Sequence, residues 1–90
     1  MAFNLELSPK AVGELDHLNR SDIERIVKKL HWFAENFNEV KPERLTGELK
    51  GLFKFRIGDY RAIYSLDSGK QQIIILAIGH RSEVYKPNQS

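Results

Sequence analysis

The hydrophobic pattern of this chain changes its period twice, and that change restricts the possible folds more than any other feature of the sequence. Apolar residues alternate with polar ones over residues 3–7, which predicts a strand with one buried face. Residues 8–37 carry apolar side chains at helical spacing. Alternation returns after residue 52 in three segments separated by turn-forming residues. The predicted order is therefore strand, helix, helix, strand, strand, strand.

Two helices are expected in the segment with helical spacing. Ser8 before Pro9 is typical of an N-cap followed by proline in the first turn, which begins a short helix. Ser21 and Glu24 form a capping box that predicts the start of a second helix. The buried stripe of that helix is expected to contain Ile23, Ile26, Val27, Leu30, Phe33, Ala34 and Phe37. The short polar break between the helices favours an antiparallel helical hairpin.

The second half of the chain predicts most of the sheet. Residues 38–48 lack a clear pattern and are expected to form a loop, in which residues 42–45 could make one isolated turn. Residues 72–78 are apolar on both faces, which predicts a central strand. We therefore expect an α+β fold in which two N-terminal helices pack on one face of a mostly antiparallel, strongly twisted sheet of about four strands.

One domain over residues 1–90 is expected, because this length is below the commonest domain size. No apolar run approaches the roughly 18 residues of a membrane helix, and no targeting segment is visible, so a cytoplasmic location without a membrane partner is expected. The absence of cysteine excludes disulfides and thiolate metal sites. The three histidines lack metal-ligand spacing, so no metal and no cofactor are expected.

Positive charge is concentrated in the second half of the chain. Residues 1–43 carry six Lys and Arg against eight Asp and Glu, whereas residues 44–90 carry eight against four. A basic bias of this size is compatible with a polyanionic partner such as nucleic acid, but it does not require one. The positions of the individual cations are therefore more informative than the net charge.

Three cations are predicted to share one face of the first hairpin. With Gly58 and Asp59 in the turn, Arg56 lies opposite Arg61, and Lys54 follows on the same face. Like charges directly opposite each other destabilise a sheet, and Asp59 is the only acid expected nearby. This juxtaposition favours an anion-binding site over the alternative, in which the cations only keep the hairpin solvated.

The end of the last strand is expected to extend this cationic surface. His80 and Arg81 directly follow the apolar segment, and Tyr85 and Lys86 come a few residues later. Because the apolar segment must pair with the hairpin strands to be buried, Arg81 is expected to reach the same patch. The direction of the His80 side chain is left open, since neighbouring residues in a strand point to opposite faces.

Three motifs in the basic half resemble the RelE/ParE superfamily of toxins from toxin–antitoxin systems, and its RelE branch most closely. They are LKG at residues 49–51, FKFRIGDYRAIY at residues 53–64 and IGHRSEVY at residues 78–85. The strand and paired helices ahead of them match the family's β-α-α-β-β-β layout over the whole chain. The resemblance implies a single RelE-like toxin domain and a metal-independent endoribonuclease that cleaves messenger RNA in the ribosomal A site.

The resemblance also implies roles for individual residues. Catalytic positions of the family are matched by Lys54, Arg61, Arg81 and Tyr85, and its second basic strand position by Arg56. Besides Arg56, the RNA- or phosphate-binding residues that we expect are Lys50, His80 and Lys86. Arg56 stands where the best-known relatives carry lysine. A guanidinium stays charged and is a poor proton acceptor, so Arg56 is expected to clamp phosphate rather than act as a base.

The implied reaction is transesterification, in which the ribose 2′-OH attacks the adjacent phosphorus and leaves a 2′,3′-cyclic phosphate and a 5′-OH. Lys54 is the candidate general base because neighbouring cations favour the neutral form of a lysine, and His80 is the alternative. Arg61 would hold the nonbridging oxygens, and Arg81 would stabilise the leaving oxygen. Tyr85 would orient the 2′-OH or stack on a base. Such weak acids and bases predict little cleavage of RNA that no ribosome has aligned.

The implied partners are messenger RNA, the ribosome and a cognate RelB-like antitoxin, with DNA reached only through the antitoxin complex at its operator. The antitoxin is expected to cover the basic face with an acidic amphipathic segment, and its docking positions are expected around Leu45, Leu49, Leu52 and Trp32. Two other functions stay open. One is a ParE-like poison of DNA gyrase, and the other is a noncatalytic RNA-binding domain.

Overall fold

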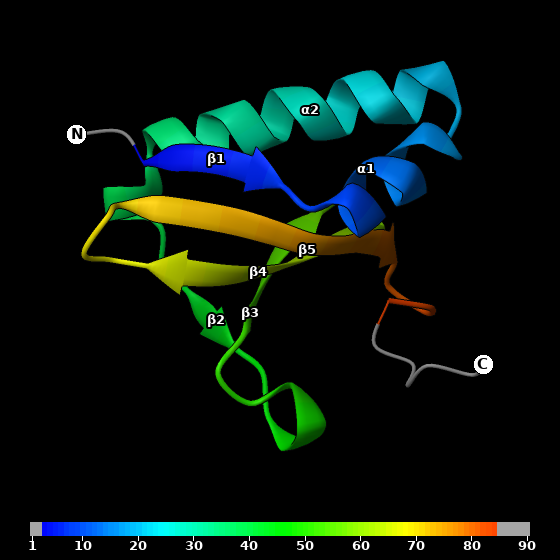
Figure 1. The fold of residues 1–90 in the computed structure, drawn as a ribbon. Helices are drawn as coiled ribbons and strands as arrows, with labels where there is room; N and C mark the ends of the chain where they lie inside the picture. The colour runs from blue at the N-terminus through cyan, green and yellow to red at the C-terminus, as the bar shows by residue number, and fades with distance from the viewer. Residues whose placement is uncertain (1–2, 85–90) are drawn as a thin grey trace.

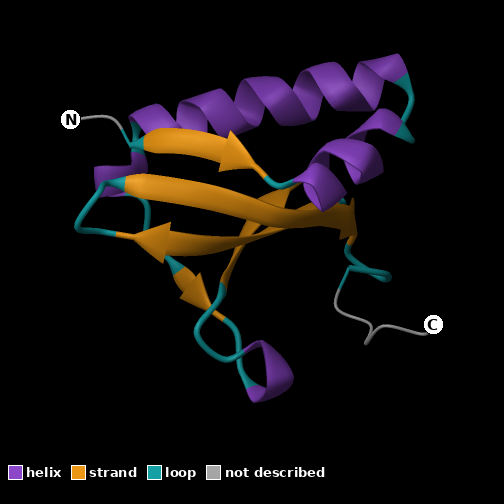
Figure 2. Ribbon diagram, in the orientation of Figure 1, coloured by secondary structure: helices purple, strands orange, loops and turns teal. Residues whose placement is uncertain are grey.

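The computed structural model describes residues 3–84, which form a sheet of five strands covered by two α-helices. The strands are β1 (Asn4–Leu7), β2 (Glu43–Arg44), β3 (Phe53–Ile57), β4 (Tyr60–Asp67) and β5 (Gln72–His80). The helices are α1 (Pro9–Asp16) and α2 (Arg20–Glu35), and the short 3₁₀ turns are η1 (Phe37–Glu39) and η2 (Gly47–Leu49). Figure 2 shows both helices on the same side of the sheet.

The strands are ordered β1-β5-β4-β3-β2 across the sheet (Figure 1). The pair β1 and β5 is parallel, and the other three pairs are antiparallel. The predicted α+β fold is therefore confirmed, with both helices on one face and β5 in the interior of the sheet. The sheet has five strands instead of about four, because a short strand precedes the first hairpin.

The additional strand, β2, lies where the sequence predicts a loop. Its two residues, Glu43 and Arg44, pair with Lys54 and Phe53 of β3. Two residues are too few to show the alternation by which a strand is recognised. The strand exists through this pairing with a distant part of the chain, which leaves no local signal in the sequence.

The first predicted helix start is confirmed, and the second is wrong by two residues. Ser8 caps α1 by accepting a hydrogen bond from the Ala11 backbone N–H. The cap of α2 is Asn19, whose side-chain oxygen accepts from the Asp22 backbone N–H at 2.8 Å, so the predicted capping box around Ser21 does not form. Asn is as good an N-cap as Ser, and the earlier cap lengthens the helix by two residues.

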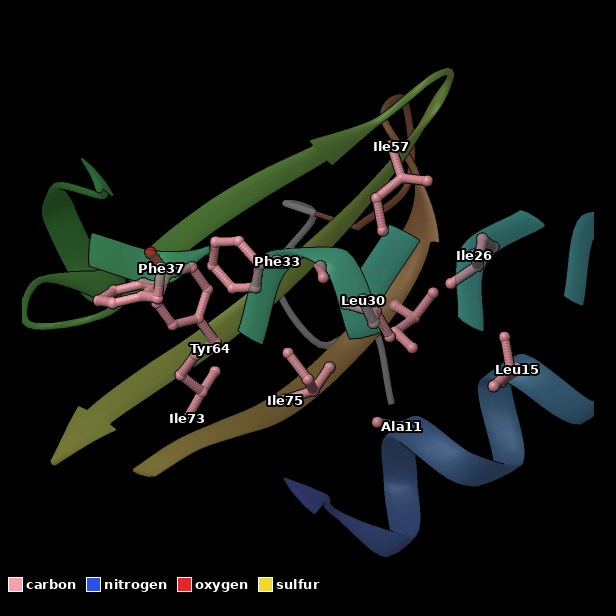
Figure 3. Packing of buried hydrophobic residues seen from close by; sticks show 12 residues of the cluster. Ala11, Leu15, Ile26, Leu30, Phe33, Phe37, Ile57, Tyr64, Ile73 and Ile75 are labelled. Atoms are coloured by element: carbon pink, nitrogen blue, oxygen red, sulfur yellow. The ribbon is translucent and has the colours of Figure 1, made fainter. Parts of the chain in front are cut away.

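The core lies between α2 and the sheet, as Figure 3 shows. Phe33 at its centre stacks on Phe55 with 3.9 Å between ring centroids and meets the ring of Tyr64 edge-on at 5.2 Å. Phe37 is buried as predicted, although it lies in η1 after the helix ends. Val27 is 37% exposed, so its assignment to the buried stripe is wrong. The packed side of α2 fixes the helix over β3, β4 and β5.

Candidate functional site

The β3–β4 hairpin has the predicted register. Arg56 pairs with Arg61 across two strands, and the two-residue turn consists of Gly58 and Asp59. Gly58 has a φ of 59°, a left-handed conformation that glycine adopts without steric cost. Because Ile57 and the residues in phase with it join the helix-covered core, alternation places both arginines on the opposite side of the sheet, here called the outer face.

The Arg61 side chain is fixed at the tip of this hairpin. Its Nη1 atom donates hydrogen bonds of 2.8 Å to the carbonyl oxygens of Gly58 and Tyr60. Both bonds use the same nitrogen, and a guanidinium has five N–H donors in a fixed fork. The remaining donors of Arg61 therefore have a defined orientation in which they can meet an anion.

A carboxylate that the sequence does not predict lies on the same face. Glu43 of β2 stands opposite Lys54 and accepts a hydrogen bond of 3.1 Å from Nη2 of Arg56. The expectation that Asp59 is the only acid near the cations is therefore wrong. Both partners of the ion pair are well exposed, so solvent screens it and an incoming anion can compete for Arg56.

The outer face is partly apolar beneath the cations. Lys54 lies opposite Ile63 on β4, and Ile63 lies opposite Ala77 on β5. Ile63 is 4% exposed and Ala77 is 7% exposed, and Lys54 itself is half-buried. An ion bound beside these side chains would be less hydrated than one on a fully polar surface, which strengthens its attraction to the cations.

The backbone of Arg81 lies beside the tip of the hairpin. Its backbone N–H donates a 2.8 Å hydrogen bond to the carbonyl oxygen of Asp59. The chain then turns, with the N–H groups of Glu83 and Val84 bonded to the His80 carbonyl. A Cβ atom at Gly79 would lie 3.3 Å from Val84, so this turn packs against the strand at a residue that needs no side chain. The arginines Arg56, Arg61 and Arg81 are called the tip cluster below.

The structure places His80 away from the outer face. His80 pairs with Tyr60, whose side chain contacts α2, and the two rings lie 5.9 Å apart. A bulge in β5 opposite Ile63 and Tyr64 reverses the alternation along the strand, which turns His80 to the helix side. Its Nδ1 accepts a 3.2 Å hydrogen bond from the Ser82 backbone N–H, so a neutral ring carries its proton on Nε2.

One further predicted site residue, Lys50, is not brought to the tip cluster. Lys50 follows η2 at the far end of β3, in a hollow that it shares with Arg44 and the loop around Gly47. This loop projects from the body of the fold in Figure 1. Tyr85 and Lys86 lie outside the described residues.

A second polar contact fixes the hairpin from the helix side, and sequence reasoning misses it. The Tyr60 hydroxyl donates a 3.1 Å hydrogen bond to Oδ2 of Asp22, whose Oδ1 accepts from Arg25 at 3.1 Å. The hydrogen bond to Asp22 raises the pKa of Tyr60, because the carboxylate favours the protonated phenol. The contact joins residues 38 positions apart in the chain, so no local sequence motif indicates it.

The tip cluster can bind a phosphate and stabilise negative charge that develops on it. Within residues 3–84 no group of three or more His, Cys, Asp or Glu could hold a metal ion. None of the helices in this part of the chain is long and apolar enough to cross a membrane.

Comparison with known proteins gives one family and several similar structures. The model of the family described as "ParE toxin of type II toxin-antitoxin system, parDE" matches residues 5–85. Toxin RelE of Mycobacterium tuberculosis (strain ATCC 25618 / H37Rv) is 41% identical over 44 residues, which are 49% of this chain and 45% of the relative. The match thus spans less than half the length of that relative.

Two crystal structures have the same fold. A chain of the RelBE2 toxin–antitoxin complex from Mycobacterium tuberculosis superposes with a TM-score of 0.81 and 24% identity, covering 90% of this chain and all of that chain. A chain of the archaeal RelE–RelB complex from Pyrococcus horikoshii OT3 gives a TM-score of 0.71 and 25% identity, covering 93% of this chain and all of that chain.

Proposed function

Because this chain belongs to the ParE toxin family of type II toxin–antitoxin systems, within the RelE/ParE superfamily, we propose that it cleaves messenger RNA in the ribosomal A site. The observation that carries this proposal is the tip cluster. Arg56 and Arg61 face each other across the hairpin, and the Arg81 backbone, just after β5, is bonded to the hairpin turn. The Arg61 guanidinium is already oriented by two carbonyl oxygens. Preoriented cations of this kind suit the charge that builds up on a phosphate during strand cleavage.

The proposed step is an in-line transesterification. The ribose 2′-oxygen forms a bond to phosphorus and gives its proton to Nζ of Lys54, the proposed base. The bond from phosphorus to the 5′-oxygen breaks, and that oxygen takes up a proton from solvent, while Lys54 releases to solvent the proton that it received. The products are a 2′,3′-cyclic phosphate and a 5′-OH, and no water molecule is consumed.

Each cation has a separate proposed role in this step. Arg61 binds the nonbridging oxygens, Arg56 clamps phosphate after leaving Glu43, and Arg81 stabilises the departing 5′-oxygen. The position of Lys54 on the outer face supports it as the base over His80, whose ring lies on the helix side. Tyr85 keeps its proposed role toward the 2′-OH or a base.

We also propose a RelB-like antitoxin as the physiological partner of this chain. The similar chains from Mycobacterium tuberculosis and Pyrococcus horikoshii were crystallised as toxin–antitoxin complexes, which supports the proposal. An acidic antitoxin segment would compete with RNA for the exposed cations of the outer face.

Poisoning of DNA gyrase is the second candidate, because the matching family model is named for ParE. The two functions differ in the first process that fails in a growing cell. We would induce the full chain in a bacterium and follow protein synthesis and DNA breakage from the first minutes. Arg61→Ala and Arg81→Ala test the tip cluster, and Lys70→Ala, an exposed residue in the β4–β5 turn, is the matched control.

Cleavage in the A site predicts that protein synthesis stops before DNA breaks appear. Arg61→Ala, Arg81→Ala and Tyr85→Ala should then remove toxicity while thermal unfolding still reports a folded protein, and Lys70→Ala should remain toxic. DNA breaks that precede any loss of translation, with Tyr85→Ala fully toxic, would support the gyrase poison and contradict RNA cleavage.

A further inference from the structure

A pocket of about 370 Å³ lies between α2 and the tip of the β3–β4 hairpin. Ile57, labelled in Figure 3, forms part of its floor beside Gly58 of the turn. The helix side is formed by Arg25, Lys28, Lys29 and Trp32. Its volume is within the range of pockets that bind small organic groups.

The four helix residues of this pocket form one stripe. Their spacing of three, four and seven residues places them on the same face of α2. Trp32 is 44% exposed, which is unusual for so large an apolar side chain, and Lys29 Nζ lies 4.3 Å from the centre of its ring. The pocket therefore combines an exposed aromatic ring with an ammonium group over one face of that ring, which leaves the other face for a ligand.

The charge of the lining is wholly positive. Three of the six lining residues are cations, and none is an acid. Arg25 forms an ion pair with Asp22, which also accepts a hydrogen bond from the Tyr60 hydroxyl. The positive charge that faces an incoming ligand therefore comes mainly from Lys28 and Lys29. A ligand that fits must be anionic and must also present an apolar or aromatic face.

The pocket and the tip cluster meet at the same turn. The carbonyl oxygen of Gly58, which lines the pocket, accepts a hydrogen bond from the Arg61 side chain, and that of the next residue, Asp59, accepts from the Arg81 backbone N–H. An RNA strand that is bound to the tip cluster on the outer face therefore needs to pass only around this turn to reach Trp32.

We propose that this pocket binds a nucleotide of the same single-stranded RNA, with its base against Trp32 and the adjoining phosphates on Lys28 and Lys29. Every base has an apolar π-face that stacks on an aromatic ring, and the flanking phosphates match the two ammonium groups. The inference rests on the proposed RNA-cleaving function, because the RNA that reaches the pocket is the one held by the tip cluster. An acidic protein segment is the competing occupant.

Trp32 is the only tryptophan of the chain, so fluorescence excited at wavelengths that tyrosine does not absorb reports on this pocket. The probe is a short 2′-O-methyl oligouridylate, which cannot be cleaved because its 2′-oxygen carries no proton and is blocked by methyl. Binding should quench the Trp32 emission in a saturable manner. Anisotropy of the same oligonucleotide carrying a fluorescent label measures affinity independently of the tryptophan.

Three variants separate stacking from charge. Trp32→Leu should lower affinity about tenfold, the effect of losing one stacked base. The double variant Lys28→Gln, Lys29→Gln should lower it by a similar factor and reduce the slope of log affinity against log salt by about 1.4, since each phosphate contact contributes about 0.7. Lys70→Gln removes one exposed charge at the opposite end of β4 and should change affinity less than about twofold.

Other outcomes would overturn the inference. RNA that binds without quenching Trp32, loses affinity in Arg61→Ala and ignores the α2 variants would show that RNA stays on the outer face, which leaves the proposed function intact. Quenching by a polyglutamate peptide but not by RNA would assign the pocket to an acidic protein segment. No binding of RNA at all would also reject the pocket, and cleavage on ribosomes would then judge the proposed function separately.

Discussion

Arg56 stands directly opposite Arg61 on neighbouring strands, and Glu43 holds Arg56 through a 3.1 Å ion pair. Two like charges in this position oppose sheet formation by some tenths of a kcal/mol. The fold offsets one charge with a carboxylate and directs the other toward two carbonyl oxygens. A phosphate could replace the carboxylate, because the ion pair is exposed to solvent.

Replacing Glu43 by Gln should therefore strengthen RNA binding. The change removes a negative charge next to Arg56 and Lys54, and we expect the affinity for a short RNA to rise about two- to fivefold, as expected for an exposed pair worth up to about 1 kcal/mol. The free energy of unfolding should change by less than about 1 kcal/mol. Anisotropy at fixed salt and urea unfolding measure the two quantities.

Glu48→Gln is the control for this change, since Glu48 is exposed in η2 at the far end of β3. It removes the same charge and should leave the affinity close to that of the wild type. A loss of affinity in Glu43→Gln would contradict the competition between Glu43 and phosphate for Arg56.

The start of α2 gives a test of the structure that does not depend on function. Asn19→Ala should lower the free energy of unfolding by about 1 kcal/mol, because the Asp22 N–H loses its cap. Ser21→Ala should have almost no effect, since Ser21 is exposed inside the helix and alanine is a good helix former. Chemical denaturation of both variants shows whether Asn19 or Ser21 caps the helix. A larger loss of stability in Ser21→Ala than in Asn19→Ala would support the capping box that the sequence predicts.

The order of the main elements could be predicted because their patterns are local. The stripe through Ile26, Leu30 and Phe33 has helical spacing, and all three residues are buried against the sheet. The register of Arg56 and Arg61 was also predictable, since a two-residue turn fixes the pairing of the strands that it joins. Local pattern and local geometry were sufficient for both.

What could not be predicted depends on contacts between distant segments. Glu43 reaches the outer face only because β2 pairs with β3, and Asp22 reaches Tyr60 across 38 residues. The direction of His80 depends on the bulge opposite Ile63, and an apolar strand buried on both faces carries no sign of a bulge. These three features all change the account of the site, while the fold class stays the same.

Tyr64 offers a test of the core. It is fully buried, and among the described residues its hydroxyl has no hydrogen-bond partner. Tyr64→Phe keeps the ring contacts and removes the unsatisfied hydroxyl, so the free energy of unfolding should stay the same or rise by about 1 kcal/mol. A loss greater than about 1 kcal/mol would mean that the hydroxyl is hydrogen-bonded in solution.

The pH dependence of the free energy of unfolding should differ between the wild type and Tyr64→Phe. Burial raises the pKa of Tyr64 from 10.0 to about 12, so the folded state holds this proton more tightly than the unfolded state. The stabilisation is complete below pH 10 and is lost as the pH rises from 10 toward 12. Wild type should therefore lose stability faster than Tyr64→Phe over this range. The free energy of unfolding would be measured by denaturant titrations at several pH values. An equal decrease with pH in both proteins would contradict the raised pKa of Tyr64. Tyr60 titrates in both proteins and cancels in the comparison.

Primer extension on messenger RNA bound to programmed ribosomes tests most directly whether the tip cluster cleaves RNA. Wild type, Arg61→Ala, Arg81→Ala and Lys70→Ala would be compared, each with the same RNA free of ribosomes. We predict cuts in register with the A-site codon for wild type and Lys70→Ala, none for the two arginine variants, and little cleavage of free RNA. Folded wild-type protein that leaves ribosome-bound messenger intact, or Arg61→Ala and Arg81→Ala that cut as well as wild type, would contradict the proposed site.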